Sequence, residues 1–311
     1  MSILCMGSSV MDVTALGVPG QHAWREKQRI PQIRMAPGGD AVNQANRLSD
    51  MGEQVFLFTG TGCDEMGGYL VSQLESRGVA ASFIARRPDL TTGTSVVLVS
   101  TDGERTIFSA GGAYQTLSAE HLPQLADPLL KDLQAVSIGS LLQMPLLESS
   151  GFAAFLEEAR SRQIRVFADL ASDKTEAEFS RITHLLPFID YFMPSLKDAL
   201  LMTGARSAAE AAGIFQAYGC ANVIIKCGAD GCYCLSDEFT GNVPAICVEP
   251  VDTTGAGDTM IACFIHGLLN GMPMESACRA ACAYASYSTL FPGASDCKIE
   301  EGTYREWLAS R

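Results

Sequence analysis

Residues 251–258, Val-Asp-Thr-Thr-Gly-Ala-Gly-Asp, form the segment best suited to chemistry. They stand between a strand-like run, 246–248, and an apolar run, 259–269, that predicts a buried helix. Small residues at the start of that helix would present N–H groups at the positive end of its dipole and would admit an anion. Asp258 would lie beside the anion and could accept a hydroxyl proton. An anion site with an adjacent carboxylate suits phosphoryl transfer, although Asp258 alone could equally cap the helix.

A second candidate site begins with the Gly38-Gly39 turn, which opens a helix that Gly52 would end. Asn43 falls in the first turn of this helix, and its amide can both donate to and accept from a sugar hydroxyl. Asp12 follows the first predicted strand, at the end of the sheet where open parallel sheets bind their ligands. Each has a structural alternative: a solvated helix position for Asn43 and an Asx turn for Asp12.

To position these residues, the chain must fold as alternating strands and helices. β-rich runs predict buried strands at 3–7, 55–60, 135–138, 166–169, 191–193 and 222–226. Amphipathic or apolar runs predict helices at 41–51, 65–76, 119–131, 146–162, 175–186, 208–218, 257–270, 274–290 and 300–309. The alternation favours a mostly parallel sheet with helices on both faces, ended by antiparallel strands within 226–248.

Two stretches interrupt this alternation, at about 13–37 and 94–111. The second contains Asp102-Gly103 between two β-rich runs, which is a hairpin signal. We expect the two stretches to pair into a small antiparallel sheet that projects as a lid over a ligand site, within a single domain spanning 1–311. The alternative is a surface hairpin with no role.

The composition excludes several classes of partner. The 311 residues carry 22 Lys and Arg against 35 Asp and Glu, a net charge of −13, which argues against binding to nucleic acid or to anionic membranes. No apolar run reaches membrane-spanning length, and the N-terminus lacks the basic start of a signal peptide. The 11 cysteines include no Cys-x-x-Cys pair, which predicts reduced thiols in a cytoplasmic protein. Cys278 and Cys282 could share a helix face, but the sequence shows no His or second Cys pair to complete a zinc site.

Taken in order, these motifs resemble those of the ribokinase-like carbohydrate kinases, the PfkB family. The likeness includes Asp12 and the segments 38–52, 62–67, 102–105, 226–231 and 252–258. The resemblance implies transfer of a phosphoryl group from ATP to a hydroxymethyl group of a small sugar or sugar derivative, with Mg²⁺. It also implies a three-layer α/β/α core and a β-lid, which in several members is the interface of a homodimer.

The resemblance further implies a role for each motif residue. Asp258 would be the catalytic base, and the amides of Gly255, Ala256 and Gly257 would form an anion hole. The sugar would contact Asp12, Gly38, Gly39 and Asn43, and the nucleotide would lie along Ser195, Lys226, Gly228 and Gly231. A monovalent cation such as K⁺ would bind near Asp252 and Thr254.

The chain departs from the family pattern in one place. The family's Asn-x-x-Glu, which is tied to Mg²⁺ and phosphate binding, is replaced by Ser195 and Asp198. Asp198 keeps a carboxylate, one methylene shorter, as the candidate Mg²⁺ ligand. Asp169, at a strand end, lacks the Asn and Arg that follow it in many sugar kinases, so no sugar contact is transferred to it.

Two alternative functions fit the same motifs. A nucleoside kinase shares the scaffold, and Ser195 motivates the hypothesis of a degenerate, sugar-binding regulator without turnover. A dehydrogenase is disfavoured, because Glu65 takes the third glycine position after Gly60-Thr61-Gly62. A P-loop kinase is excluded, because the sequence contains no Gly-Lys dipeptide.

Overall fold

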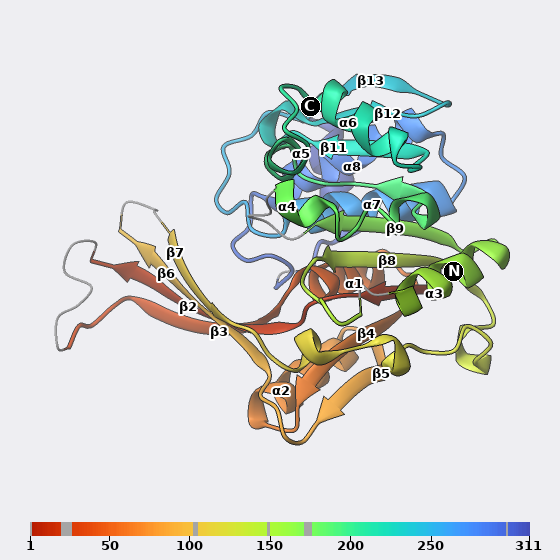
Figure 1. Cartoon of the computed structure of the whole chain (residues 1–311). Coiled ribbons are helices and arrows are strands. Elements are labelled where there is room, and N and C mark those ends of the chain that lie inside the picture. Colours follow the sequence, from red (N-terminus) through yellow and green to blue (C-terminus); the bar gives the residue numbers. More distant parts are fainter. Residues whose placement is uncertain (1, 20–26, 102–104, 148–149, 171–175, 297) are drawn as a thin grey trace.

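A nine-stranded sheet forms the centre of the molecule, with strand order β13-β12-β11-β10-β9-β8-β1-β4-β5 (Figure 1). The computed structural model describes residues 2–19, 27–101, 105–147, 150–170, 176–296 and 298–311. Neighbouring strands are parallel except at β11–β12 and β12–β13, which confirms the mostly parallel sheet and its antiparallel end. The strands are β1 (Ser2–Met6), β4 (Gln54–Gly62), β5 (Val79–Arg87), β8 (Leu133–Leu141), β9 (Arg165–Leu170), β10 (Tyr191–Phe192), β11 (Asn222–Lys226), β12 (Cys232–Leu235) and β13 (Thr240–Val243).

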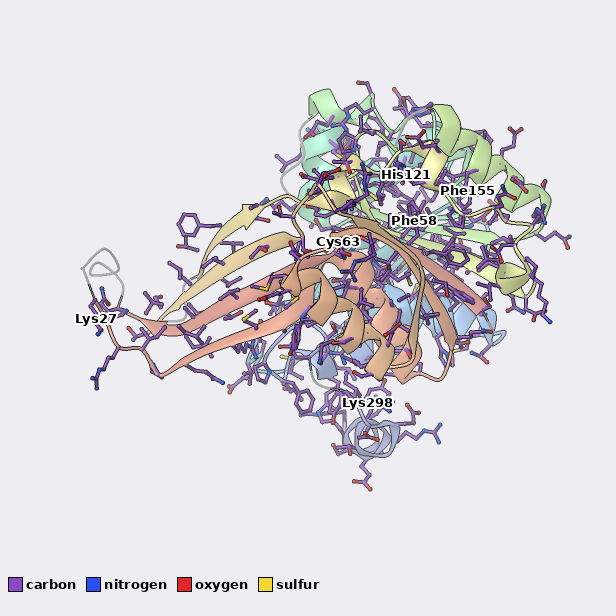
Figure 2. All side chains as sticks on the ribbon, turned by 90° about the horizontal axis from the view of Figure 1, so that it is seen from below. Lys27, Phe58, Cys63, His121, Phe155 and Lys298 are labelled. Carbon is purple, nitrogen blue, oxygen red and sulfur yellow. The ribbon has the colours of Figure 1, made fainter. Side chains whose placement is uncertain are left out.

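Helices cover both faces of this sheet. One layer contains α1 (Asp40–Asp50), α2 (Glu65–Ser76), α7 (Ala256–Leu269), α8 (Met274–Ser288) and α9 (Glu301–Ala309). The other contains α3 (Ser150–Ser161), α4 (Glu176–Phe179), α5 (Leu196–Thr203) and α6 (Ala208–Ala217). Alternate residues of each strand feed two apolar clusters: Leu4 belongs to one and Cys5 to the other. Phe58 and Phe155, labelled in Figure 2, both belong to the cluster under α3–α6. The predicted α/β/α core is therefore confirmed.

Helix α7 lies at the centre of its layer, between α1 and α8 and against β8. Its residues from Asp258 to Ile265 are all buried, as its all-round apolar sequence predicts. The helix that carries the candidate base is thus fixed by packing on every side. Among the described residues, no helix is both long and apolar enough to cross a membrane.

The lid is a second, four-stranded sheet that projects from the core in Figure 1. Its order is β3-β2-β6-β7, with β2 (Val10–Val18), β3 (Gln32–Gly38), β6 (Gly93–Ser100) and β7 (Arg105–Ala110). The outer pairs are antiparallel as expected, whereas the central pair, β2–β6, is parallel. The lid begins at Val10, earlier than predicted, so Asp12 is itself a lid residue. The predicted turn at Asp102-Gly103 lies outside the described residues.

Three predicted elements are wrong. Residues 119–131 form only the short 3-10 turns Ala119–His121 and Pro128–Leu130, because prolines at 123 and 128 cannot donate to a continuous helix. Of the predicted helix 175–186, the described part keeps only Glu176–Phe179 before the chain turns. The run 246–248 pairs with no strand, since β13 already ends the sheet before Pro244.

Strand β5 and helix α5 were not predicted. The apolar positions of β5 are only partly buried because it is the edge strand, so its sequence lacks the strong pattern of an inner strand. Helix α5 is eight residues long, which leaves little room for a helical period to show.

Candidate active site

The N-terminus of α7 requires glycine for two reasons. Gly255, the residue before the helix, has a φ of 69°, and a Cβ built on it would lie 2.7 Å from the Cβ of Ala294. Within the described residues, no side chain caps this end by a hydrogen bond. The Ala256 N–H makes only a long bond of 3.3 Å to the Thr253 carbonyl. The positive end of the dipole is therefore suited to an external anion.

Asp258, in the first turn of α7, is held by two amide side chains of α1. Asn43 Nδ2 donates to Asp258 Oδ2 at 2.9 Å, and Gln44 Nε2 donates to Oδ1 at 3.2 Å. Behind them, Ser137 Oγ donates to Gln44 Oε1 at 2.7 Å, and Ser295 Oγ donates to Asn43 Oδ1 at 3.0 Å. Each donor in this network points towards the carboxylate, so the network fixes its orientation and favours its ionised form.

Arg47 joins the elements that surround this network. Its side chain is only 2% exposed. Its Nε donates to Thr259 Oγ1 at 3.2 Å, and one terminal nitrogen donates to the Ala294 carbonyl at 2.9 Å. The other terminal nitrogen lies 3.6 Å from a carboxylate oxygen of Asp50. Arg47 thereby ties α1 to α7 and to the segment that carries Ser295.

The environment of Asp258 raises its pKa to about 6. Burial is the largest cause, and the negative charge of Asp169 acts in the same direction. Hydrogen bonds from Asn43 and Gln44 and the charge of Lys226 act against the rise. A carboxylate with this pKa is ionised at neutral pH and more basic than a solvated aspartate, as a general base should be.

Lys226, at the end of β11, lies beside the start of α7. Its Nζ is 2.5 Å from Asp169 Oδ2 and donates to the Met193 carbonyl at 2.6 Å. A Cβ on Gly257 would lie 3.5 Å from Lys226 Cε and 3.8 Å from Nζ, so the lysine side chain passes over Gly257. The structure thus places a cation next to the predicted anion hole.

Asp198 lies near this ion pair and is 2% exposed. Ser195 Oγ donates to Asp198 Oδ2 at 2.5 Å, and the Asp198 N–H donates to Ser195 Oγ at 3.1 Å, which caps α5. Oδ1 of Asp198 is buried and has no hydrogen-bond partner in the described part of the chain. Burial raises the pKa of Asp169, Lys226 lowers it, and the charge of Asp198 raises it again. An unpartnered buried oxygen and two repelling carboxylates together fit a divalent cation.

Asp12 projects from lid strand β2 against Gly38 of β3. A Cβ on Gly38 would overlap with Asp12 Oδ2, so only glycine leaves room for the carboxylate. Gly39 has a φ of 98°, and its Cβ would collide with the Ser8 carbonyl. Burial, and after it the negative charge of Asp296, raise the pKa of Asp12 to about 6, against the effects of a hydrogen bond from Ser95 and the charge of Arg34. The lid therefore presents a partly buried carboxyl group with a raised pKa.

The loop before α7 is braced by Asp252. Its Oδ1 accepts from the Thr254 N–H at 2.9 Å and from Thr254 Oγ1 at 2.7 Å, and its Oδ2 accepts from the Gly293 N–H at 2.9 Å. Arg34 of the lid lies 3.9 Å from the same Oδ2. These bonds hold the loop before α7 against the segment that carries Gly293.

The predicted nucleotide residues lie on two neighbouring segments. Ser195 and Lys226 pair by an isolated parallel bridge. Beyond Lys226 the chain turns through Gly228 (φ 60°) and Gly231 (φ 92°), and the Cys227 N–H donates to the Gly231 carbonyl at 2.7 Å. A Cβ on Gly231 would overlap with the Val243 carbonyl, so this turn needs glycine.

Three residues of the site were missed by sequence reasoning. Gln44 stands next to Asn43 in the sequence, so a second amide in the first helical turn was a usable signal. Asp169 was set aside because its family neighbours are absent, yet it pairs with Lys226. Ser295 comes from a distant loop, and no local pattern pointed to it.

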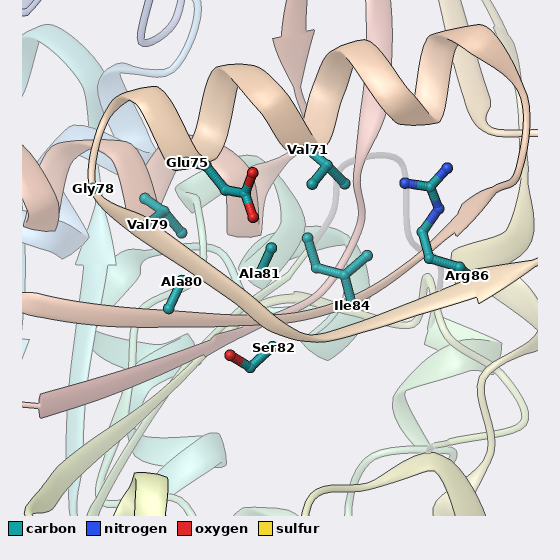
Figure 3. Close-up of a pocket in the computed structure, with 9 residues that line it drawn as sticks. All are labelled: Val71, Glu75, Gly78, Val79, Ala80, Ala81, Ser82, Ile84 and Arg86. Atoms are coloured by element: carbon teal, nitrogen blue, oxygen red, sulfur yellow. The ribbon is translucent and has the colours of Figure 1, made fainter.

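A groove elsewhere carries none of these residues. It has a volume of about 630 Å³ and lies between α2 and edge strand β5. Figure 3 shows Val71 and Glu75 on one wall and Ala81, Ile84 and Arg86 on the other. The groove follows from the uncovered sheet edge and is separate from the site around Asp258.

Comparisons with known proteins identify the family of this chain. The family model for pfkB family carbohydrate kinases matches residues 1–301. The chain is 25% identical over 319 residues to a deoxyribokinase of Salmonella typhi, covering 99% of each chain. It is 27% identical over 296 residues to a ribokinase of Haemophilus influenzae, covering 92% of this chain and 90% of the relative.

Among solved structures, a chain from E. coli in complex with ATP and Mg²⁺ has the same fold, with a TM-score of 0.83 and 20% identity over 100% of this chain and 99% of its own. That protein binds ATP and Mg²⁺. Together with the match to the family model over nearly the whole length, these findings show that the chain belongs to the pfkB family of carbohydrate kinases and is a phosphotransferase with an alcohol group as acceptor.

Proposed function

We propose that this kinase transfers a phosphoryl group from ATP to a hydroxymethyl group of a small sugar. The observation that carries the proposal is the placement of Asp258. A buried carboxylate with a pKa of about 6 is oriented by two amides beside a helix N-terminus that Lys226 overlies. This combination joins a base for a hydroxyl proton to a positive field for phosphoryl oxygens.

The sugar would lie between the lid and α1, with Asp12 accepting hydrogen bonds from its hydroxyls. Its hydroxymethyl oxygen would attack the terminal phosphorus of ATP while Asp258 accepts the hydroxyl proton, and ADP would leave. Lys226 and the N–H groups of 255–257 would stabilise the charge on the transferring group. Asn43 and Gln44 would act by holding Asp258, since both donate to it.

The donor set beside Lys226 fits Mg²⁺. Asp198 and Asp169 would hold the ion, because both are buried and Asp198 Oδ1 lacks a partner among the described residues. The ion supplies charge neutralisation at the phosphate oxygens. Ser195 would orient Asp198, to which it donates at 2.5 Å. K⁺ or a similar ion near Asp252 and Thr254 would act on the loop that precedes the anion hole.

A pentose is the substrate class that the relatives favour. The deoxyribokinase and the ribokinase match at 25% and 27% identity over more than nine-tenths of the chain. A nucleoside would need the same ribose contacts and additional room for a base. We therefore expect turnover with ribose or 2-deoxyribose, and a panel containing both sugars and nucleosides decides between the two classes.

The test is ADP release with ATP and Mg²⁺ over a panel of ribose, 2-deoxyribose, fructose, tagatose, ketodeoxygluconate, inosine and adenosine. Asp258→Asn keeps the shape and removes the base, so kcat should fall by about 10²–10⁴ with little change in sugar affinity. The exposed Asp237→Asn is the matched control and should keep full activity. A loss of less than about tenfold in Asp258→Asn would exclude it as the base. Thermal stabilisation by a sugar without ADP release would indicate the regulator.

The lid also offers a surface for a second copy of this chain. Met35, Val13, Val96 and Phe108 stand opposite one another across the four strands, so their side chains share one face. Three of these side chains are exposed: Met35 by 44%, Val96 by 38% and Phe108 by 49%. The opposite face carries Asp12 and Ser95, which meet across the same strands. A homodimer would cover the apolar face and leave the site face free.

A further inference from the structure

Four cysteines that are far apart in the sequence meet under α8. Cys232 and Cys234 alternate along β12 and point to the same face, as their complete burial and the half-exposure of their neighbours show. Cys278 and Cys282 are one turn apart on α8 and are also buried. Strand β12 therefore supplies a second cysteine pair, which lies far in the sequence from the pair on α8. We name these four residues the thiol cluster.

The sulfur atoms of the thiol cluster form a connected set. Cys234 Sγ lies 3.3 Å from Cys278 Sγ, Cys232 Sγ lies 3.7 Å from Cys282 Sγ, and Cys232 Sγ lies 3.9 Å from Cys234 Sγ. The sulfur atoms of Cys232, Cys234 and Cys278 all lie within 4.8 Å of one another. Strand and helix thus meet in register, each cysteine of β12 facing one of α8.

The spacings among Cys232, Cys234 and Cys278 match three ligands of a thiolate metal site, and Cys282, with its Sγ 3.7 Å from that of Cys232, is the candidate fourth ligand. Four sulfurs about 2.3 Å from a tetrahedral ion lie about 3.8 Å from one another, whereas bonded sulfurs of a disulfide lie about 2.05 Å apart. Thiolates select soft d¹⁰ ions such as Zn²⁺ over Mg²⁺ or K⁺.

We propose that the thiol cluster is a structural metal site that binds Zn²⁺ through cysteine thiolates. Binding requires no oxidant, because each coordinating thiol releases its proton to solvent and no electron is transferred. The ion would fix β12 to α8. Cys232 follows directly on Gly231 and stands opposite Lys226, while Thr289, just beyond α8, accepts from the N–H groups of Val251 and Asp252. The site would therefore brace the two segments on either side of the phosphate-binding region, without contacting substrate.

The test measures metal content, independently of activity. The chain is purified without metal-affinity resin, refolded with equimolar Zn²⁺, desalted and analysed by mass spectrometry of the element. We expect about one zinc per chain in the wild type, and less than about a tenth of that in Cys234→Ala and Cys278→Ala. Cys220→Ala, a buried cysteine outside the thiol cluster, is the matched control and should keep its zinc.

A second measurement needs no variant. Wild-type chain loaded with Co²⁺ should show the sulfur-to-metal charge-transfer absorption of thiolate ligands, and Zn²⁺ should displace it. Wild type that takes up neither ion would overturn the proposal and leave the cysteines as packing groups. An intact mass about 2 Da below the fully reduced value would also overturn it, because it would show a disulfide in place of free thiols.

Discussion

At the residue scale, Asp258 is the candidate base, and the fold changes its acidity. Its pKa is raised from 3.8 to about 6, so the folded chain binds an extra proton between about pH 4 and 6. Since the ionised form is the base, kcat/KM should fall tenfold per pH unit below about 6. Because the folded chain binds this proton more tightly than the unfolded chain does, the contribution of Asp258 to the free energy of unfolding falls as the pH rises from about 4 to 6. A pH–rate profile measured at saturating Mg²⁺ checks the first point, and activity that stays flat down to pH 5 would contradict it.

Asp198 is the residue whose charge the metal site depends on. Asp198→Asn preserves the shape and the bond from Ser195 but removes the charge, so we expect the Mg²⁺ concentration for half-maximal rate to rise by about 10–100-fold. At saturating Mg²⁺ much of the rate should return, which a purely structural role would not produce. An Mg²⁺ titration of wild type, of this variant and of the exposed Asp237→Asn measures the effect. Identical titrations would remove Asp198 from the metal site.

At the scale of elements, Arg47 holds α1 against α7. It is buried and contacts Thr259, the Ala294 carbonyl and Asp50. Arg47→Ala should lower the free energy of unfolding by about 3–5 kcal/mol, because the groups it bonds stay buried without it. Arg279→Ala, which removes an exposed arginine paired with Glu275 on α8, should cost less than about 0.5 kcal/mol. Urea unfolding followed by circular dichroism compares them, and equal midpoints would contradict the role of Arg47.

The elements also show how far sequence reasoning reaches. Strand β4 and helix α1 were predicted within two residues, because the buried strand reads as a short β-rich run and the helix is bounded by the Gly38-Gly39 turn and Gly52. The 3-10 turns at 113–130 follow packing against the sheet, and no local period marks them. In the site, Asp258 was predictable because the residues that open α7 are contiguous in the sequence, so their pattern can be read directly. Its contacts with Gln44 and Ser295 depend on how α1, α7 and a distant loop pack, which the sequence does not express.

At the scale of the whole molecule, we propose that the lid determines whether two chains assemble. Its apolar face includes Ile33, exposed by 64%, beside a concavity of about 990 Å³ between the lid and α2. If this face joins two chains, a charge placed there is desolvated in the dimer and hydrated in the monomer. Ile33→Glu combined with Phe108→Glu should therefore shift the mass in solution from twice 33.2 kDa to 33.2 kDa. Leu129→Glu, which places a charge at an exposed leucine outside the lid, should leave the dimer intact. Light scattering after size-exclusion chromatography at micromolar concentration measures the wild type and both variants.

Because Arg34 contacts Asp252 and Asp296 from the other face of the same strand, separation of the lids should also raise the KM for sugar more than it lowers kcat. A wild type that elutes as a monomer would show that the chain itself, and not a second copy, keeps the lid in place.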